Sequence, residues 1–252
     1  MLVNAEVDKE LSWKPSLHFK ANDHLTVVVE ASDDAPYPRI FEMRRQAVIA
    51  LNRPVSIYCI CPEESYLSDQ SEAKRLIADG YGLLTVDASG NVQKRESCIP
   101  LLQQITRQEF KAEIKPLPQK IRALCAEAFD AYNHNAQSGT AKMTEIIEGL
   151  ILKAGRDAVK KGWLTAADAR AGQSQNTLTK MQAASQFNNV VAAIGAVQGY
   201  VSEYRNPNHH WPKDKKQAAK KYRDCRHGFL DGLKKSVMFR DAMRKIGLSG
   251  SI

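Results

Sequence analysis

The sequence predicts two domains, an α/β domain in the first half of the chain and an all-α helical bundle in the second half. Runs rich in β-branched residues alternate with helical spacings in the first half only, whereas the second half has four long helical tracts and no strand pattern. The charge follows the same division. Residues 1–107 contain 12 Lys and Arg against 15 Asp and Glu, and residues 108–252 contain 24 against 13. A basic second half of this kind favours a polyanionic partner.

The first half has an alternating order of strands and helices. The segment 25–30 (LTVVVE) is β-branched and has turn-forming residues on both sides, which predicts a strand. Apolar residues at helical spacing then predict a helix at 39–51. The remaining elements are a strand at 55–61, a helix at 71–79 that ends before Gly80, and a strand at 81–87.

The sequence predicts that the second half consists of helices that follow a short linker. Two prolines, Pro116 and Pro118, favour a linker at 108–118, which separates a domain at 1–107 from one at 119–252. Apolar stripes at a spacing of three and four residues predict helices at 119–133, 144–162, 175–204 and 213–245. Four helices of this length predict a bundle.

Composition favours a cytoplasmic protein without a membrane partner. No run approaches the roughly 18 apolar residues that span a bilayer, and the first ten residues lack the apolar core of a secretory signal. The five cysteines are odd in number and scattered along the chain, which favours reduced thiols.

The segment 205–210 (RNPNHH) carries the most specific chemistry. Pro207 disfavours a helical conformation at Asn206, so the third helical tract is expected to end near Arg205. A guanidinium can hold a phosphate, and a histidine transfers protons near neutral pH, so Arg205 and His210 suit cleavage of a phosphodiester by its own ribose 2′-hydroxyl. The spacing by itself is expected about once by chance in a chain with this many arginines and histidines. The position of the motif between two predicted helices and next to a basic run is what supports a catalytic role.

Two other interpretations of this region remain open. Arg205 and the histidines can instead cap helices and bond to one another. A zinc site formed by Cys225 and His227 with His209 and His210 is disfavoured, because a C-x-H spacing on a helix directs the side chains of Cys225 and His227 about 200° apart.

The residues that follow the motif favour RNA binding. The run after the motif includes Lys213, Lys215, Lys216 and Lys220, which can follow an RNA backbone, although such a run is usually a solvated helix face. The aromatic residues Trp211, Tyr200 and Tyr204 flank the motif and suit either base stacking or packing in the core.

On these residues, 119–252 resembles a HEPN domain, an all-α family whose signature is Arg, a polar residue, and His after four to six positions. The resemblance implies a metal-independent endoribonuclease of prokaryotic antiviral defence or of a toxin-like system, without a cofactor, that cleaves tRNA or mRNA. It implies a homodimer through the bundle, with both motifs at a shared cleft, and leaves room for a regulatory protein partner. Arg205, Asn206 and His210 match the catalytic positions, and His209 is a secondary candidate. Some members are non-catalytic, so a nucleic-acid-binding or scaffold protein is the alternative.

The order of elements in 11–95 resembles the restriction-endonuclease-like (PD-(D/E)xK) fold, a mixed sheet with flanking helices. That family has an Asp after a proline and then an acid-x-Lys at the end of the next strand, where two acids bind a divalent metal. Here Ser16 follows Pro15, and Ser32 stands in the lysine position, so only Glu30 remains of the three. The resemblance therefore implies an inactive domain of sensor or regulatory type, with Glu30 as a remnant and no metal site.

Overall fold

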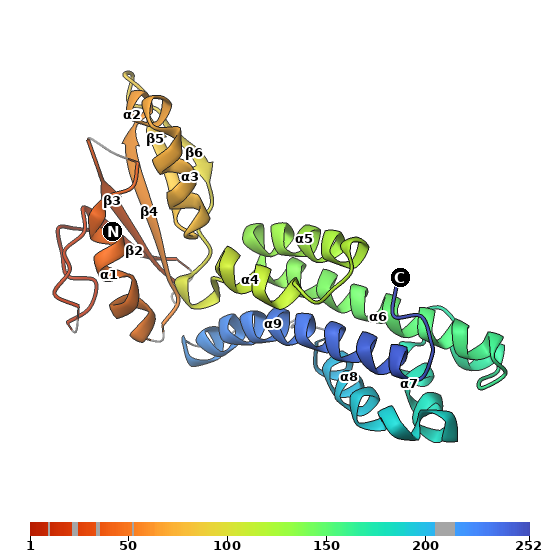
Figure 1. Ribbon diagram of the computed structural model, residues 1–252. Coiled ribbons are helices and arrows are strands. Elements are labelled where there is room, and N and C mark those ends of the chain that lie inside the picture. The colour runs from red at the N-terminus through yellow and green to blue at the C-terminus, as the bar shows by residue number, and fades with distance from the viewer. Residues whose placement is uncertain (10, 22–24, 34–35, 52, 205–214) are drawn as a thin grey trace. The chain divides into compact units, whose positions relative to one another are not determined.

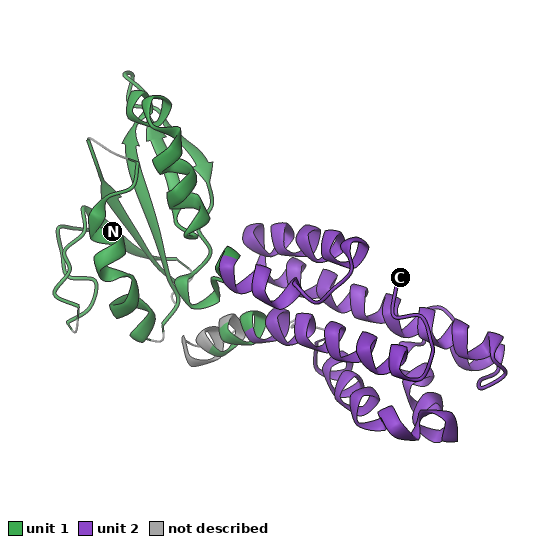
Figure 2. Ribbon diagram, viewed as in Figure 1, with its two compact units in different colours: residues 1–107, 210–226 green, residues 108–209, 227–252 purple. Residues whose placement is uncertain are grey.

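The chain divides into two compact units. A computed structural model describes residues 1–9, 11–21, 25–33, 36–51, 53–204 and 215–252 (Figure 1). Residues 1–107 and 210–226 form the first unit, here called the sheet unit, and residues 108–209 and 227–252 form the second, here called the helical unit (Figure 2). The helix α9 (Lys215–Lys245) contributes to both.

The sheet unit contains a six-stranded mixed sheet. Its strands are β1 (Leu2–Val3), β2 (Leu17–Ala21), β3 (Leu25–Ala31), β4 (Val55–Pro62), β5 (Gly82–Val86) and β6 (Val92–Glu96). They lie in sequence order; β3, β4 and β5 are parallel, and the other neighbours are antiparallel. The sequence did not predict β1 or β6. The β6 segment VQKRE has one apolar residue, Val92, which is 57% exposed, so it lacks the apolar alternation that marks a half-buried strand.

Helices cover one face of the sheet. Besides the first part of α9, this unit has the helices α1 (Arg39–Ala50), α2 (Glu63–Ser68), α3 (Gln70–Ala78) and the short η1 (Leu101–Gln103). The strand register places Val28, Ile57 and Leu83 on one face, where Phe41 of α1 and Leu76 of α3 complete the core. Right-handed crossovers between parallel neighbours place successive helices on the same side of a sheet, which agrees with this packing. Cys59 and Cys61 are part of the same core.

The helical unit is built on a cluster of aromatic rings. Its elements are α4 (Arg107–Ile114), α5 (Gln119–His134), α6 (Ala136–Lys160), η2 (Ala166–Ala169), α7 (Ser174–Ala183), η3 (Ser185–Val190), α8 (Val191–Tyr204) and the second part of α9. Phe110 stacks on Phe129 with ring centroids 4.2 Å apart, and Phe229 lies 4.8 Å from Tyr132. These rings join α4, α5 and α9. Within the described ranges, no helix is both long enough and apolar enough to cross a membrane.

The structure confirms a mixed sheet followed by a helical region and corrects the details. The expected linker at 108–118 is largely helix α4, and Phe110 is buried. Pro118 stands at the N-cap of α5, so the prolines mark a helix start and not an extended spacer.

Two predicted helix boundaries are also wrong. The helix α6 begins at Ala136, eight residues before the expected start, because the Asn135 side chain accepts hydrogen bonds from the amides of Gln137 and Ser138. The tract expected as one helix at 175–204 is broken after Ala183 into α7, η3 and α8. Phe187 anchors η3 in the core, and its neighbours Asn188 and Asn189 are exposed.

Candidate functional site

The Arg–His motif falls between α8 and α9, in a segment that the structure does not describe. Arg205, Asn206, His209, His210, Trp211 and Lys213 all lie outside the described residues. Lys215 and Lys216 belong to the first turn of α9, and their side chains also lie outside the description. Lys220 is exposed on α9. The structure therefore describes the two helices that flank the motif, α8 before it and α9 after it.

The last turns of α8 pack tightly on α9. Tyr200 and Tyr204 are both buried, and two glycines four residues apart on α9 receive them. A Cβ atom at Gly228 would lie 2.6 Å from the Tyr204 ring, and one at Gly232 would lie 2.5 Å from the Tyr200 hydroxyl oxygen. Only a residue without a side chain permits this approach. The two tyrosines are therefore core residues of the helical unit, and base stacking is not their role.

The two helical residues considered for a zinc site, Cys225 and His227, differ in exposure. Cys225 is buried, whereas His227 is exposed on the same helix. Among the described residues, no group of three His, Cys, Asp or Glu side chains lies close enough together to hold a metal ion.

Two of the three positions that resemble a degenerate nuclease site, Ser16 and Glu30, are in contact. The Ser16 amide donates a hydrogen bond to Glu30 Oε2 at 3.0 Å, and the Ser16 hydroxyl accepts one from the Ala31 amide at 2.9 Å. The amide of Ser32 donates to the carbonyl of Ile60 at 2.9 Å. Burial raises the pKa of Glu30, and the Ser16 amide offsets part of that rise. Glu30 is thus a half-buried carboxyl whose nearest polar partner is backbone.

Glu30→Gln should make the protein slightly more stable at pH 7. Because the folded-state pKa of Glu30 is raised, its ionisation favours the unfolded chain as pH rises above about 4.3, the ordinary pKa of glutamate. A glutamine keeps the bond to the Ser16 amide and does not ionise. We expect thermal unfolding to show a gain of about 1–2 °C at pH 7 that shrinks toward pH 4. A loss of stability at pH 7 would show that the carboxylate is needed.

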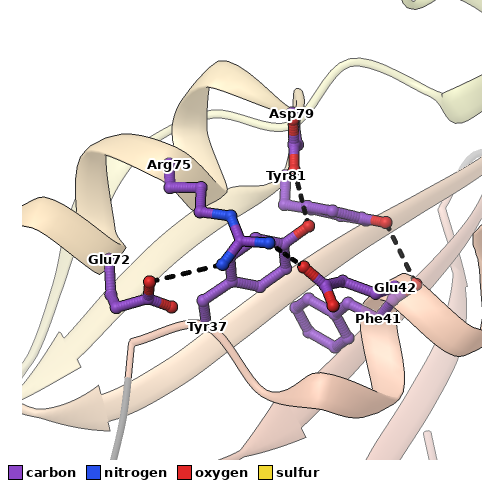
Figure 3. Close-up of polar contacts among 7 residues, drawn as sticks. All are labelled: Tyr37, Phe41, Glu42, Glu72, Arg75, Asp79 and Tyr81. Atoms are coloured by element: carbon purple, nitrogen blue, oxygen red, sulfur yellow. Dashed lines mark hydrogen bonds and ion pairs between the residues drawn. The ribbon is translucent and has the colours of Figure 1, made fainter.

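A second polar cluster, not predicted from the sequence, joins α1, α3 and the start of β5 (Figure 3). Tyr37 donates to Asp79 Oδ2 at 2.6 Å, and Tyr81 donates to the Phe41 carbonyl at 3.2 Å. Arg75 pairs with Glu42 and Glu72 and lies over the Tyr37 ring, 5.1 Å from its centroid. Apart from Arg75 and Glu72, which are three residues apart on α3, the partners are distant in sequence, and no spacing pattern links them. Since these polar groups bond to one another, the cluster holds α1 against α3.

Tyr37→Phe should weaken the sheet unit and change its response to alkali. The variant loses the bond to Asp79, which we expect to cost about 1 kcal/mol at pH 7. Burial and the bond to Asp79 raise the pKa of Tyr37, so above about pH 10 the unfolded chain loses its proton first and stability falls as pH rises. Urea unfolding between pH 8 and about 11 checks this. The variant should lose less stability over that range than the wild type; equal slopes would exclude Tyr37 as the cause.

No protein-family model, curated protein or solved structure matches this chain. The coarse class, a mixed sheet joined to a helical region, comes from the structure. The HEPN and restriction-endonuclease resemblances depend on the residues of the chain itself.

Proposed function

We propose that the protein is a metal-independent endoribonuclease of HEPN type. The observation that carries the proposal is the motif from Arg205 to His210, which directly follows the buried turn of α8 at Tyr204. That turn is held on α9 at Gly228, so the chain enters the motif from a fixed point of the helical unit. A catalytic arginine and histidine need a rigid support of this kind.

The proposed reaction requires only protein side chains. Arg205 binds the scissile phosphate and stabilises the negative charge that develops on its oxygens. Asn206 positions the phosphate. His210 serves in proton transfer, either from the ribose 2′-hydroxyl as that oxygen attacks phosphorus or to the departing 5′-oxygen. The P–O5′ bond breaks as the P–O2′ bond forms, and the products are a 2′,3′-cyclic phosphate and a 5′-hydroxyl.

The proposal extends to partners. Lys213, Lys215, Lys216, Lys220 and Trp211 would contact an RNA substrate, either tRNA or mRNA. Two chains would pair through the helical region and bring two motifs to one cleft, as the resemblance implies. A prokaryotic antiviral or toxin-like role, in the cytoplasm, completes this proposal.

The sheet unit is proposed as an inactive, regulatory relative of restriction-endonuclease-like domains. The contact between Ser16 and Glu30 supports it, because the two positions that would hold catalytic acids are adjacent and one is a serine. A single carboxyl, bonded to a backbone amide, is a poor ligand set for Mg²⁺.

The test uses purified protein and end-labelled RNA in EDTA. We expect cleavage that leaves cyclic phosphate ends, and no cleavage of the same RNA with 2′-O-methyl groups, which lack the nucleophile. Cleavage of the methylated RNA would exclude internal 2′-hydroxyl attack. Binding without cleavage would favour the alternative of a nucleic-acid-binding or scaffold protein.

A further inference from the structure

The basic first part of α9 belongs to the sheet unit. Residues 210–226 group with residues 1–107, as the green part of α9 shows (Figure 2). The part of this segment that belongs to α9, residues 215–226, holds six Lys and Arg against one Asp. The sequence had assigned the basic character to the second half of the chain alone. The structure instead assigns the most basic run to the unit that contains the sheet.

A hydrogen bond fastens this segment to the sheet unit. Arg226 Nε donates to the main-chain carbonyl of Gln104 at 3.0 Å. Gln104 is itself buried and held in place, because its side-chain Nε2 donates to the carbonyls of Gly80 at 2.5 Å and Ile99 at 3.3 Å. Its amide also donates to the carbonyl of Leu101, at 3.2 Å. The acceptor that Arg226 uses is therefore a fixed point of the sheet unit.

The same helix exposes two further cations near Arg226. Lys220 and Arg223 are exposed, and a separation of three residues places them on one face of a helix. Cys225, two residues beyond Arg223, is 3% exposed, as expected for the opposite side. With Arg226 bonded to Gln104, the orientation of this face on the sheet unit is set.

We infer that the sheet unit forms part of the RNA-binding surface, and that Arg226 is a positioning residue that presents Lys220 and Arg223 to the phosphate backbone. This inference rests on the proposed function, since it assumes that the basic run binds RNA. It gives the sheet unit a direct part in substrate binding, in addition to any regulatory role.

The experiment measures how full-length protein binds a non-cleavable 2′-O-methyl oligoribonucleotide as salt rises from about 50 to 200 mM. Gln104→Ala keeps every charge but removes the bonds that fix the acceptor carbonyl. It should lower affinity roughly three- to tenfold, because the basic face must be ordered on binding, with an unchanged salt slope. Lys220→Met removes one charge and should reduce the slope by about 0.7, the amount for one phosphate contact on a single strand.

Arg226→Met is the second variant, since Gln104→Ala can also disturb the fold near Gly80. It removes the donor and one charge, so it should lower affinity more than Lys220→Met does. Hydrogen exchange of the amides of residues 220–226 should accelerate in Gln104→Ala and Arg226→Met and stay unchanged in Lys220→Met. The exchange rate of these amides reports how firmly this part of α9 is held in place, and it is measured independently of RNA cleavage.

The outcomes separate the two proposals. One result would overturn the inference and leave the proposed function standing. In that result the wild type binds RNA, Gln104→Ala and Arg226→Met bind it at least as tightly as Lys220→Met does, and hydrogen exchange of residues 220–226 is unchanged in both. Arg226 would then have no positioning role. If the wild type shows no salt-dependent binding of RNA, the RNA-binding part of the proposed function fails and this inference fails with it.

Discussion

Replacement of Arg205 or His210 by alanine should nearly abolish RNA cleavage in EDTA. General acid–base catalysis typically contributes about 10²- to 10⁴-fold, and one group that stabilises a developing oxyanion contributes about 10²- to 10³-fold. We therefore expect each single variant to lose at least about 100-fold in cleavage rate. Because the two groups act on the same phosphodiester, the double variant should lose far less than the product of the two single losses.

Matched variants make this result specific. His209→Ala removes the neighbouring histidine and should keep cleavage within a few-fold of the wild type, since the resemblance assigns the proton transfer to His210. Arg205→Lys keeps the charge but loses the forked geometry of the guanidinium, so it should restore little activity. If His209→Ala is the inactive variant and His210→Ala is active, the assignment of the two histidines is reversed.

Gly228→Ala should destabilise the helical unit and impair cleavage together. The new methyl group would lie 2.6 Å from two carbons of the Tyr204 ring, so the ring and the end of α8 must move. Overpacking of this kind costs about 1–3 kcal/mol, and the better helix propensity of alanine returns up to about 1 kcal/mol. We expect a net loss of about 1–2 kcal/mol, seen as a fall in Tm of roughly 2–6 °C.

Cleavage should fall at least about tenfold in the same variant, because Arg205 directly follows Tyr204 and catalysis is sensitive to displacements of about 1 Å. Gly199→Ala on α8 is the matched control. Apart from the backbone of α8 itself, no atom of the described residues lies within 4 Å of the added methyl group, so the change should stabilise the helix by about 0.5–1 kcal/mol. Tyr204→Leu should partly rescue the stability of Gly228→Ala by making room. A Gly228→Ala variant as stable as Gly199→Ala would show that α8 does not pack closely at this point.

Periodicity and turn residues were sufficient to predict the central strands and many of the helices. The run LTVVVE lies in β3 (Leu25–Ala31), and the helical spacing after Pro38 matches α1 (Arg39–Ala50), because in both the buried face repeats with the period of its element. Cys59 and Cys61, two residues apart on β4, lie on the same buried face, as the period of a strand requires.

Other features depend on contacts that no local pattern contains. The prolines before α5 favoured a linker, but the segment forms helix α4, in which Phe110 stacks on Phe129 of α5. The early start of α6 depends on a cap by Asn135, whereas its apolar stripe becomes clear only later in the helix. The bond from Arg226 to Gln104 joins residues 122 positions apart, so neither spacing nor composition indicates it.

Prediction of the candidate site from the sequence is limited in the same way, because part of it depends on contacts between distant residues. Residue types and spacing led to the proposal that Arg205 and His210 carry the chemistry, whereas the structure describes the contact between Tyr204 and Gly228 that precedes the motif. That support was not predicted, because a glycine on a helix shows its packing role only when its neighbour is known. No spacing pattern in the sequence indicates the contact between Ser16 and Glu30, which are 14 residues apart.

The most direct test of the central claim compares the wild type with the Arg205→Ala/His210→Ala double variant on end-labelled RNA in EDTA. The account predicts that the wild type cleaves and leaves 2′,3′-cyclic phosphate ends, while the double variant, folded to the same Tm within error, does not cleave. Cleavage by the double variant at the wild-type rate would contradict it.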